Sequence, residues 1–258
     1  MTPVLAFDIE TVPDCAGIRR LHDLPADLPD HDVAEIAAQK RRVQTGNDFL
    51  PPHLHRIIAI GCVLREGESV QVFSIGEPER DEPATIQKFF DGIEKYTPQL
   101  VSWNGSGFDL PVLNYRTLMC GGSAMKFWDQ GDDDRDFRYN NYVNRYHTRH
   151  IDLMDVLAMY QPRNSAPLDD VARLAGLPGK LGVGGPAVWA AYQKGEIRRI
   201  REYCEGDCAN TYLLYLRFQR QRGILADAEY RKECELMRAV LQAADKPYWR
   251  EFLALWKT

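Results

Sequence analysis

The stretch Leu5-Ala-Phe-Asp-Ile-Glu-Thr11 joins an apolar run to two carboxylates placed two positions apart. Residues 3–9 are apolar up to the acids, which predicts a buried strand. Successive side chains of a strand point to opposite faces, so Asp8 and Glu10 share one face and Ile9 lies on the other. Adjacent carboxylates repel each other and lose hydration when buried, and a bound divalent cation relieves both costs. The stretch therefore predicts a metal site at the end of the first strand.

Outward from this strand, the pattern predicts a small meander followed by alternating helices and strands. The runs 57–64 and 69–75 are separated by a turn, which predicts a hairpin with the first strand beside it. The later predicted elements are a helix at 84–96, strands at 100–103 and 151–152, and helices at 109–118, 152–160, 167–174, 196–221, 226–243 and 248–256, with a glycine-rich loop at 179–185. Ser165 and Gly176 are expected to cap the start and the end of the helix at 167–174. This order predicts an α/β protein with a mixed sheet.

The domain organisation is expected to be simple. Residues 14–55 contain several prolines around a helix-like stretch at about 31–44, and we expect them to form an excursion from the core. No repeat or linker divides the chain. We therefore expect one domain over residues 1–222, with residues 223–258 as a helical C-terminal extension packed on that domain.

Composition excludes several classes of protein. The chain has 258 residues, of which 45% are hydrophobic and 27% charged, as is usual for a globular protein. No apolar run approaches the roughly 18 residues of a membrane span, and no basic leader is present, so we expect neither a membrane segment nor a signal peptide. The six cysteines form no CxxC pair, which favours reduced thiols and a cytoplasmic location. A net charge of −5 argues against a protein that grips duplex DNA through many phosphates, although a local nucleic-acid site remains compatible.

Two further acidic positions extend the pair in the first strand. Asp109 follows the loop Asn104-Gly-Ser-Gly107 at a predicted strand-to-helix turn, where a helix N-cap is the competing interpretation. Tyr203 and Asp207 lie at i and i+4 on one face of the long helix, where a core tyrosine and a solvated acid would show the same spacing. Each signal alone is weak. Their combination in this order, on these element types, is much less expected by chance.

The three segments resemble the three exonuclease motifs of the DEDDy 3′–5′ exonucleases. The nearest resemblance is to stand-alone, predicted 3′–5′ exonucleases that are related to the exonuclease domain of family B DNA polymerases. The segments are Phe7-Asp-Ile-Glu-Thr11, Asn104-Gly-Ser-Gly-Phe-Asp109 and Tyr203-x-x-x-Asp207, and His150-Ile-Asp-Leu-Met-Asp-Val-Leu157 also fits. The resemblance extends from the first strand to about Phe218. It implies a ribonuclease H-like fold, with a mixed five-stranded sheet flanked by helices.

The resemblance also implies an activity: hydrolysis of phosphodiester bonds from the 3′ end of single-stranded or frayed DNA, with release of nucleoside 5′-monophosphates. Asp8, Glu10, Asp109 and Asp207 would hold two Mg²⁺ or Mn²⁺ ions, and Tyr203 would orient the attacking water. Hard cations prefer carboxylate oxygens, and two of them can stabilise both the attacking and the leaving oxygen. Because the pKa of a free tyrosine is near 10, we expect a neutral phenol that positions the water.

Four residues are candidate substrate contacts, each with a structural alternative. Thr11 would donate to the scissile phosphate or the 3′ end, or would form a turn hydrogen bond. Phe108 would stack on the terminal base or fill the core, and Lys180 would reach a phosphate from a loop that is not a P-loop. For Asn104, closing its loop is favoured over contacting sugar or phosphate. The stretch 138–150 interleaves aromatic and basic residues, and an ordered polar loop is slightly favoured over a single-strand stacking platform.

Two alternatives remain for the function. The same constellation hydrolyses RNA, so a 3′–5′ exoribonuclease is the first. A non-catalytic single-strand nucleic-acid-binding module is the second, although a complete set of acids argues against it. The expected partner is the 3′ end of a single strand, DNA before RNA. The sequence shows no polymerase domain, so any proofreading role would require a polymerase or repair partner in trans.

Overall fold

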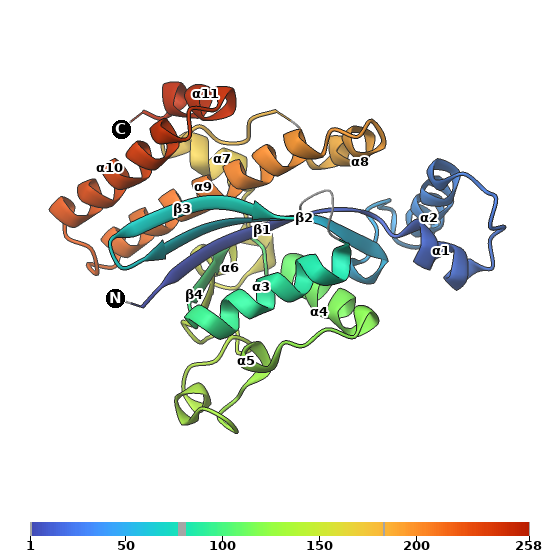
Figure 1. The fold of residues 1–258 in the computed structure, drawn as a ribbon, viewed down its shortest axis with the longest axis horizontal. Helices are drawn as coiled ribbons and strands as arrows, with labels where there is room; N and C mark the ends of the chain where they lie inside the picture. Colours follow the sequence, from blue (N-terminus) through green and yellow to red (C-terminus); the bar gives the residue numbers. More distant parts are fainter. Residues whose placement is uncertain (1, 77–80, 183, 258) are drawn as a thin grey trace.

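A computed structural model describes residues 2–76, 81–182 and 184–257, and its centre is a five-stranded sheet (Figure 1). The strand order is β3-β2-β1-β4-β5. The strands are β1 Val4–Pro13, β2 His55–Glu66, β3 Ser69–Ile75, β4 Gln99–Ser102 and β5 His150–Asp152. β2 is antiparallel to both β1 and β3, whereas β4 is parallel to both β1 and β5. The predicted hairpin and the predicted mixed five-stranded sheet are therefore confirmed.

Helices cover both faces of this sheet. The α-helices are α1 Cys15–His22, α2 Asp30–Thr45, α3 Glu82–Tyr96, α4 Asp109–Cys120, α5 Met125–Trp128, α6 Leu153–Leu157, α7 Leu168–Leu174, α8 Gly185–Gln193, α9 Ile197–Gln221, α10 Asp227–Ala243 and α11 Pro247–Leu255. Short 3-10 turns are η1 Pro52–Leu54, η2 Arg135–Arg138 and η3 Pro162–Asn164. In Figure 1, α9, α10 and α11 lie on one side of the sheet, and α3 and α4 lie on the other.

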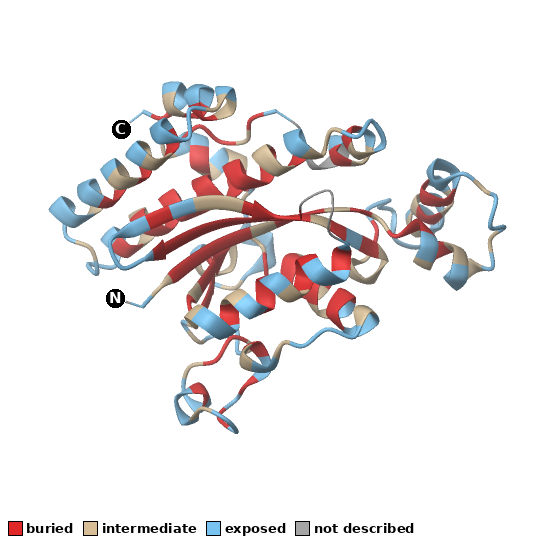
Figure 2. Cartoon of the chain, in the orientation of Figure 1, coloured by how far each residue is buried: buried red, intermediate tan, exposed pale blue. Residues whose placement is uncertain are grey.

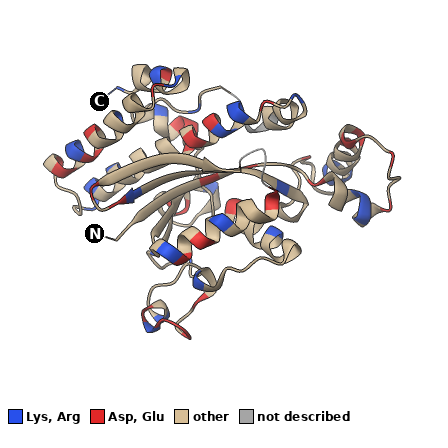
Figure 3. Ribbon diagram, in the orientation of Figure 1, with Lys and Arg blue, Asp and Glu red and all other residues tan. Residues whose placement is uncertain are grey.

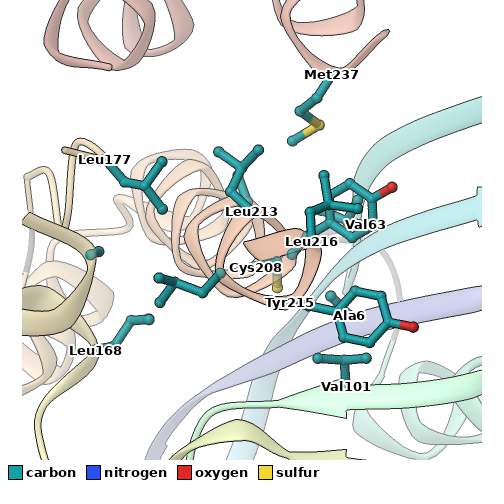
Figure 4. Close-up of a cluster of buried hydrophobic side chains, with 14 of the residues drawn as sticks. Ala6, Val63, Val101, Leu168, Leu177, Cys208, Leu213, Tyr215, Leu216 and Met237 are labelled. Carbon is teal, nitrogen blue, oxygen red and sulfur yellow. The ribbon is translucent and has the colours of Figure 1, made fainter. Parts of the chain in front are cut away.

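The alternation of side chains along β1 divides the core into two apolar clusters. Phe7 and Ile9 pack with α3 and α4, whereas Ala6 packs with α9. Figure 4 shows Cys208 and Leu213 of α9 within this second cluster. Figure 2 shows the central strands and the middle of α9 as buried. Because Asp8 has the same parity as Ala6, the fold directs it toward α9.

Several predicted boundaries differ from the structure, and two of the differences have a clear physical cause. β1 continues to Pro13, because its pairing with β2 resumes after a register shift between Glu10 and Thr11. The two acids therefore lie in the middle of the strand, and the prediction that they stand at its end is wrong. The helix predicted at 152–160 ends at Leu157, since Met159 and Tyr160 both adopt positive φ, at 52° and 59°.

The start of α7 corrects another prediction. Pro167 occupies the N-cap position, and α7 has no side-chain cap, so the predicted cap at Ser165 is wrong. A proline there fixes an extended backbone before the first turn without a side-chain hydrogen bond. At the other end, Gly176 has a φ of 74° directly after the cap residue Ala175, which agrees with the predicted helix stop.

Three α-helices were not predicted at all: α1, the short α5 and α8. α1 begins at an N-cap, Asp14, whose carboxylate accepts a hydrogen bond from the Gly17 amide at 3.0 Å. α8 begins inside the segment predicted to be a glycine-rich loop, with Pro186 in its first turn. Val183, in the same segment, lies outside the described residues. α1 and α2, within residues 14–55, project from the end of β1 and the start of β2 and pack around a small apolar cluster (Figure 1).

The C-terminal helices share the core of the sheet. Met237 and Leu241 of α10 and Trp249 and Phe252 of α11 are buried in the cluster that also contains α9. A buried ion pair, from Arg65 Nε to a Glu233 carboxylate oxygen at 2.7 Å, joins β2 to α10. The domain boundary at residue 222 stays a prediction. Within the described ranges, no helix is both long enough and apolar enough to cross a membrane.

Candidate active site

Four acidic side chains from three elements approach one another beside β1. Asp8 and Glu10 come from β1, Asp109 from the first turn of α4, and Asp207 from α9. Asp109 Oδ1 accepts a hydrogen bond from the Ile9 amide at 3.0 Å, which ties α4 directly to the strand. The N-cap of α4 is Phe108, so Asp109 does not cap the helix as the competing interpretation supposed. The acids that the sequence placed far apart are therefore brought together.

Burial makes these carboxylates costly to ionise. Burial and then the charges of neighbouring acids raise the pKa of Asp8 and the pKa of Glu10 well above their usual values. Burial, only partly offset by hydrogen bonds from backbone amides, raises the pKa of Asp109 to about 7. Burial also raises the pKa of Asp207, although Lys180 and Tyr203 oppose the shift. This concentration of negative charge requires a cation to remain ionised.

The donor set fits a hard divalent cation. Asp207 Oδ1 is buried and has no hydrogen-bond partner among the described residues. Ligand atoms of Asp8, Glu10 and Cys204 lie within 4.8 Å of one another. Burial raises the pKa of the Cys204 thiol well above its usual value, so we favour the carboxylate oxygens as ligands. Cys204 instead contacts the carbonyl oxygen of Asp8, with Sγ at 3.4 Å, and helps to hold that residue in place.

Lys180 supplies the cation that contacts these acids. Its Nζ lies 2.7 Å from Asp207 Oδ2 and donates a hydrogen bond to the Tyr203 hydroxyl at 2.8 Å. Burial alone would lower the pKa of Lys180, but the attraction of Asp207, Asp8 and Glu10 outweighs it and the pKa is raised. Burial, followed by the nearby acids, raises the pKa of Tyr203 above its usual value. The phenol is therefore neutral, as the sequence predicted.

The loop that carries Lys180 is held by α7 and α9. The Lys180 amide donates to Asp169 Oδ1 at 2.7 Å. Asn210 accepts from the Gly179 amide at 3.2 Å and donates to the Gly179 carbonyl at 2.8 Å. Gly179 has a φ of 73°, a conformation that suits glycine. These contacts fix the backbone of the loop, so that the Lys180 side chain points toward Asp207.

Two glycines allow α9 to approach its neighbours. A Cβ at Gly61 of β2 would meet the Cys204 carbonyl oxygen at 2.8 Å, so this glycine lets α9 lie close to the sheet. Gly206 directly precedes Asp207 in α9. A Cβ there would collide with the Tyr248 hydroxyl of α11. Gly206 therefore admits a side chain from the C-terminal helix.

A cavity of about 530 Å³ opens from the acids toward the excursion. Thr11, Phe108 and Lys180 line it, and their role as substrate contacts stays a prediction. Other lining residues escaped the sequence interpretation: Ala34 and Ala38 of α2, with Phe49, His55 and Trp189. The only local feature that could have indicated any of these residues is the aromatic side chain of Phe49, His55 and Trp189. Asn104 does not line this cavity.

Thr11 and Phe108 meet the same histidine. His55 Nε2 lies 3.0 Å from the Leu50 carbonyl oxygen, which can only accept, so Nδ1 accepts from the Thr11 hydroxyl at 2.8 Å. Burial lowers the pKa of His55, which agrees with a neutral ring. The Phe108 ring stands edge-on to His55 at 5.0 Å and packs with Phe49 at 5.4 Å. One aromatic wall thus borders the acids.

Asn104 closes its loop, which was the favoured interpretation. It has a φ of 66°, and its carbonyl accepts hydrogen bonds from the amides of Gly107 and Phe108, both at 3.0 Å. Asp152 accepts from the amides of Asn104 and Ser106, each at 2.9 Å. Asp152 therefore supports the loop that delivers Asp109 to the site.

The stretch 138–150 forms an ordered loop. The buried Tyr142 donates its hydroxyl proton to the Pro98 carbonyl at 2.7 Å. The Arg149 guanidinium lies over the Phe137 ring at 4.1 Å. Tyr139 and Tyr146 are exposed. Tyr142 and Arg149 thus pack internally within an ordered loop, in agreement with the favoured interpretation.

A mixed five-stranded sheet with a cluster of buried carboxylates beside its first strand defines an α/β nuclease domain. The chain belongs to the family of predicted 3′–5′ exonucleases related to the exonuclease domain of PolB, which it matches over residues 47–256. This match contains Asp109 and Asp207, whereas Asp8 and Glu10 precede it and join them only through the fold. A comparison with curated proteins finds no match. The family is one of predicted nucleases, and such exonucleases generally use divalent metals, for which the acidic cluster offers possible ligands.

Proposed function

We propose that the protein is a metal-dependent 3′–5′ exonuclease of the DEDDy type that acts on single-stranded or frayed DNA and releases nucleoside 5′-monophosphates. The observation that carries this proposal is the convergence of four acids, of which three are buried and Asp8 is half-buried, and one of which has an unpartnered oxygen. Asp8, Glu10, Asp109 and Asp207 would hold two divalent cations, Mg²⁺ or Mn²⁺. Cations bound there would make a water molecule acidic and stabilise the charge on the leaving oxygen.

The remaining residues bind and orient. Tyr203, as a neutral phenol, accepts from Lys180, and its hydroxyl would orient a water molecule once Asp207 binds a cation. Lys180 contacts Asp207 and would contact the scissile phosphate once Asp207 binds a cation. Thr11 already gives its proton to His55, so its free lone pairs would accept from a 3′-hydroxyl. This assignment reverses the donor role that the sequence suggested.

The cavity supports a substrate with an unpaired end. Phe108, Phe49 and Trp189 offer aromatic surface to a terminal base, and base stacking on such rings tolerates any sequence. α2 borders the same cavity through His31, Ala34, Glu35 and Ala38, and the two alanines leave room beside the acids. Its volume of about 530 Å³ is in the range of small-molecule sites. Such a space suits one splayed nucleotide better than a base pair.

The test is digestion of a 3′-labelled single-stranded DNA oligonucleotide with Mg²⁺ or Mn²⁺. We expect release of labelled mononucleotide, no release in a chelator, and no release by Asp8→Asn protein. A 5′-labelled copy should shorten in single-nucleotide steps. Release of mononucleotides from the 5′ label first, or equal activity in Asp8→Asn, would sink the proposal. RNA of the same sequence, tested in parallel, separates the exoribonuclease alternative, and binding without cleavage would identify the non-catalytic module.

A further inference from the structure

A second charged cavity lies away from the acids, between the C-terminal half of α9, α10 and the chain end. Its volume is about 340 Å³. The lining includes Arg217 and Arg220 of α9, Arg231 and Arg238 of α10, and Trp256. Arg217 follows Asp207 by ten residues of α9, which is about 15 Å along the helix axis. The cavity is therefore separate from the candidate active site.

Three of its arginines lack an acidic partner among the described residues. Arg217 has a buried Nε without a hydrogen-bond partner. Arg238 donates to the Trp256 carbonyl at 3.2 Å, and no ion pair involves Arg231 in the described ranges. Arg220 does have a partner, Asp227, at 2.6 Å. Guanidinium groups in such a hollow attract an anion, and they suit phosphate because their planar fork can bind two of its oxygens.

The charge of the cavity contrasts with the charge of the chain. Four arginines face two acids, Asp227 and Glu235, in a protein whose net charge is −5. Figure 3 shows the basic residues interspersed with acidic ones along α10. The balance of the lining is thus positive where the whole protein is negative. A local basic hollow on an acidic protein is the pattern expected for a specific anion contact.

Aromatic rings accompany the arginines. The Arg238 guanidinium lies over the Trp256 ring at 3.8 Å, and Arg220 lies over Tyr230 at 5.2 Å. Arginine combined with aromatic surface is the composition used to hold single-stranded nucleic acid. The ligand chemistry indicated is therefore a phosphodiester.

The chain end connects this cavity to the active-site loop. The Lys257 amide, next to Trp256, donates to the Gly176 carbonyl at 2.9 Å. Gly176 lies four residues before Lys180, which contacts Asp207. The basic cavity and the Lys180 loop are thus anchored to each other on the α9 side of the sheet (Figure 1).

From this geometry we infer that the arginine cavity binds phosphates of the substrate strand upstream of the nucleotide being removed. This inference rests on the proposed exonuclease function. It makes substrate length a determinant of affinity, because a dinucleotide occupies only the acidic site and a longer strand reaches both sites.

The first test compares a dinucleotide with a 12-nucleotide strand. Replacing both Arg231→Gln and Arg238→Gln should raise KM for the 12-mer by about 5- to 20-fold, equivalent to about 1–2 kcal/mol, with kcat unchanged. The salt dependence of 12-mer binding should weaken, with a slope smaller by about 0.7 for each phosphate that the variant no longer neutralises. Turnover of the dinucleotide should not change.

The control is Arg198→Gln, an exposed arginine at the start of α9 that pairs with Glu202 and lies outside the cavity. Equal effects on both substrates, or none on the 12-mer, would overturn the inference.

The second test does not depend on catalysis. Pyrophosphate added to metal-free protein should raise the melting temperature. The shift should disappear in Arg231→Gln and persist in Arg198→Gln and Lys180→Met. A shift that survives in Arg231→Gln, or no shift in the wild type, would overturn the anion site. The last outcome is a melting-temperature shift that depends on Arg231 in a wild-type protein that cleaves no oligonucleotide. That result would refute both the exonuclease function and the binding of a substrate strand, and would leave only the anion site.

Discussion

Buried charges occur in two regions of this molecule, and the two regions treat them differently. Close to the last residues of β1, Arg116 of α4 binds Glu82 of α3 through Nε at 2.8 Å and Asp14 at 2.5 Å. Glu82 also accepts from the Ile57 amide at 2.7 Å. All three charges are buried and satisfied. In the acidic cluster, by contrast, Lys180 is the one cation in direct contact with the acids among the described residues.

This difference separates charges that maintain the fold from charges kept for chemistry. A buried carboxylate that only supports structure is expected to have its partner within the chain, as Glu82 does. Asp8 and Glu10 have raised pKa values because burial and neighbouring acids act on them with too little compensation. Such an arrangement lowers the stability of the metal-free protein, and the proposed cations would compensate it. The two regions should therefore respond in opposite ways to mutation.

The largest expected effect is on activity in Asp8→Asn. Loss of one charged metal ligand should reduce kcat by at least about 1,000-fold, which is about 4 kcal/mol. Because the amide removes a buried charge, the metal-free variant should melt about 2–4 °C higher than the wild type, on the order of 1 kcal/mol. Mn²⁺ should raise the melting temperature of the wild type and not that of the variant. Thermal melts with and without chelator provide the measurement, and a variant that melts lower without metal would contradict the interpretation of uncompensated charge.

The reverse is expected for Arg116→Met in the satisfied region. Removing the guanidinium leaves two buried carboxylates unpaired, which should lower the free energy of unfolding by about 3–5 kcal/mol. Adding Glu82→Gln should recover part of the loss, since one of the stranded charges is removed. Urea denaturation of the single and double variants measures this coupling. The alternative outcome is additivity, in which Glu82→Gln lowers the free energy of unfolding equally in the wild type and in Arg116→Met. In that case Arg116, Glu82 and Asp14 do not act as a unit.

The acids were predictable from the sequence because their placement depends on local geometry. A spacing of two along a strand puts Asp8 and Glu10 on one face, and a spacing of four along a helix does the same for Tyr203 and Asp207. Asp109 followed from a strand-to-helix turn. Each of these spacings can be recognised in a few consecutive residues, and the fold then brings the three segments together.

The rest of the site depends on contacts between distant segments. The end of β1 was predicted too early because its last residues are held by pairing with Ile57 and its neighbours on β2. Trp189 reaches the cavity from α8, a helix that was not predicted because it follows a glycine-rich segment. Gly61 gave no signal in its strand, yet α9 could not approach without it. Tertiary packing decides these features, and no local pattern encodes them.

Tyr203→Phe should have a moderate effect that sharpens the contrast within the acidic site. The phenol carries no charge, so its loss should leave Mn²⁺ binding and stability in the presence of metal unchanged. Loss of an orienting hydroxyl should slow hydrolysis by about 10- to 100-fold, or about 1.4–2.7 kcal/mol. Calorimetric Mn²⁺ titration and single-turnover cleavage separate the two quantities. Unchanged turnover would remove Tyr203 from the mechanism, and weakened metal binding would make it a supporting residue for Asp207.

The smallest expected effect concerns His150, a buried group that belongs to the satisfied side of the comparison. Its Nε2 lies 2.8 Å from Ser102 Oγ, and burial lowers its pKa to about 4. In the unfolded chain this histidine binds a proton below about pH 6.5, whereas in the folded chain it stays neutral until about pH 4. Its contribution to the free energy of unfolding is therefore lost as the pH falls from about 6.5 to about 4. Relative to His150→Gln, the wild type should lose about 1–2 kcal/mol between pH 7 and pH 5, a difference in which the shared acids cancel. Chemical denaturation of both proteins at the two pH values measures it. Parallel pH profiles would show that His150 ionises as easily in the folded protein as in water, and would place it with the groups whose charge the fold tolerates.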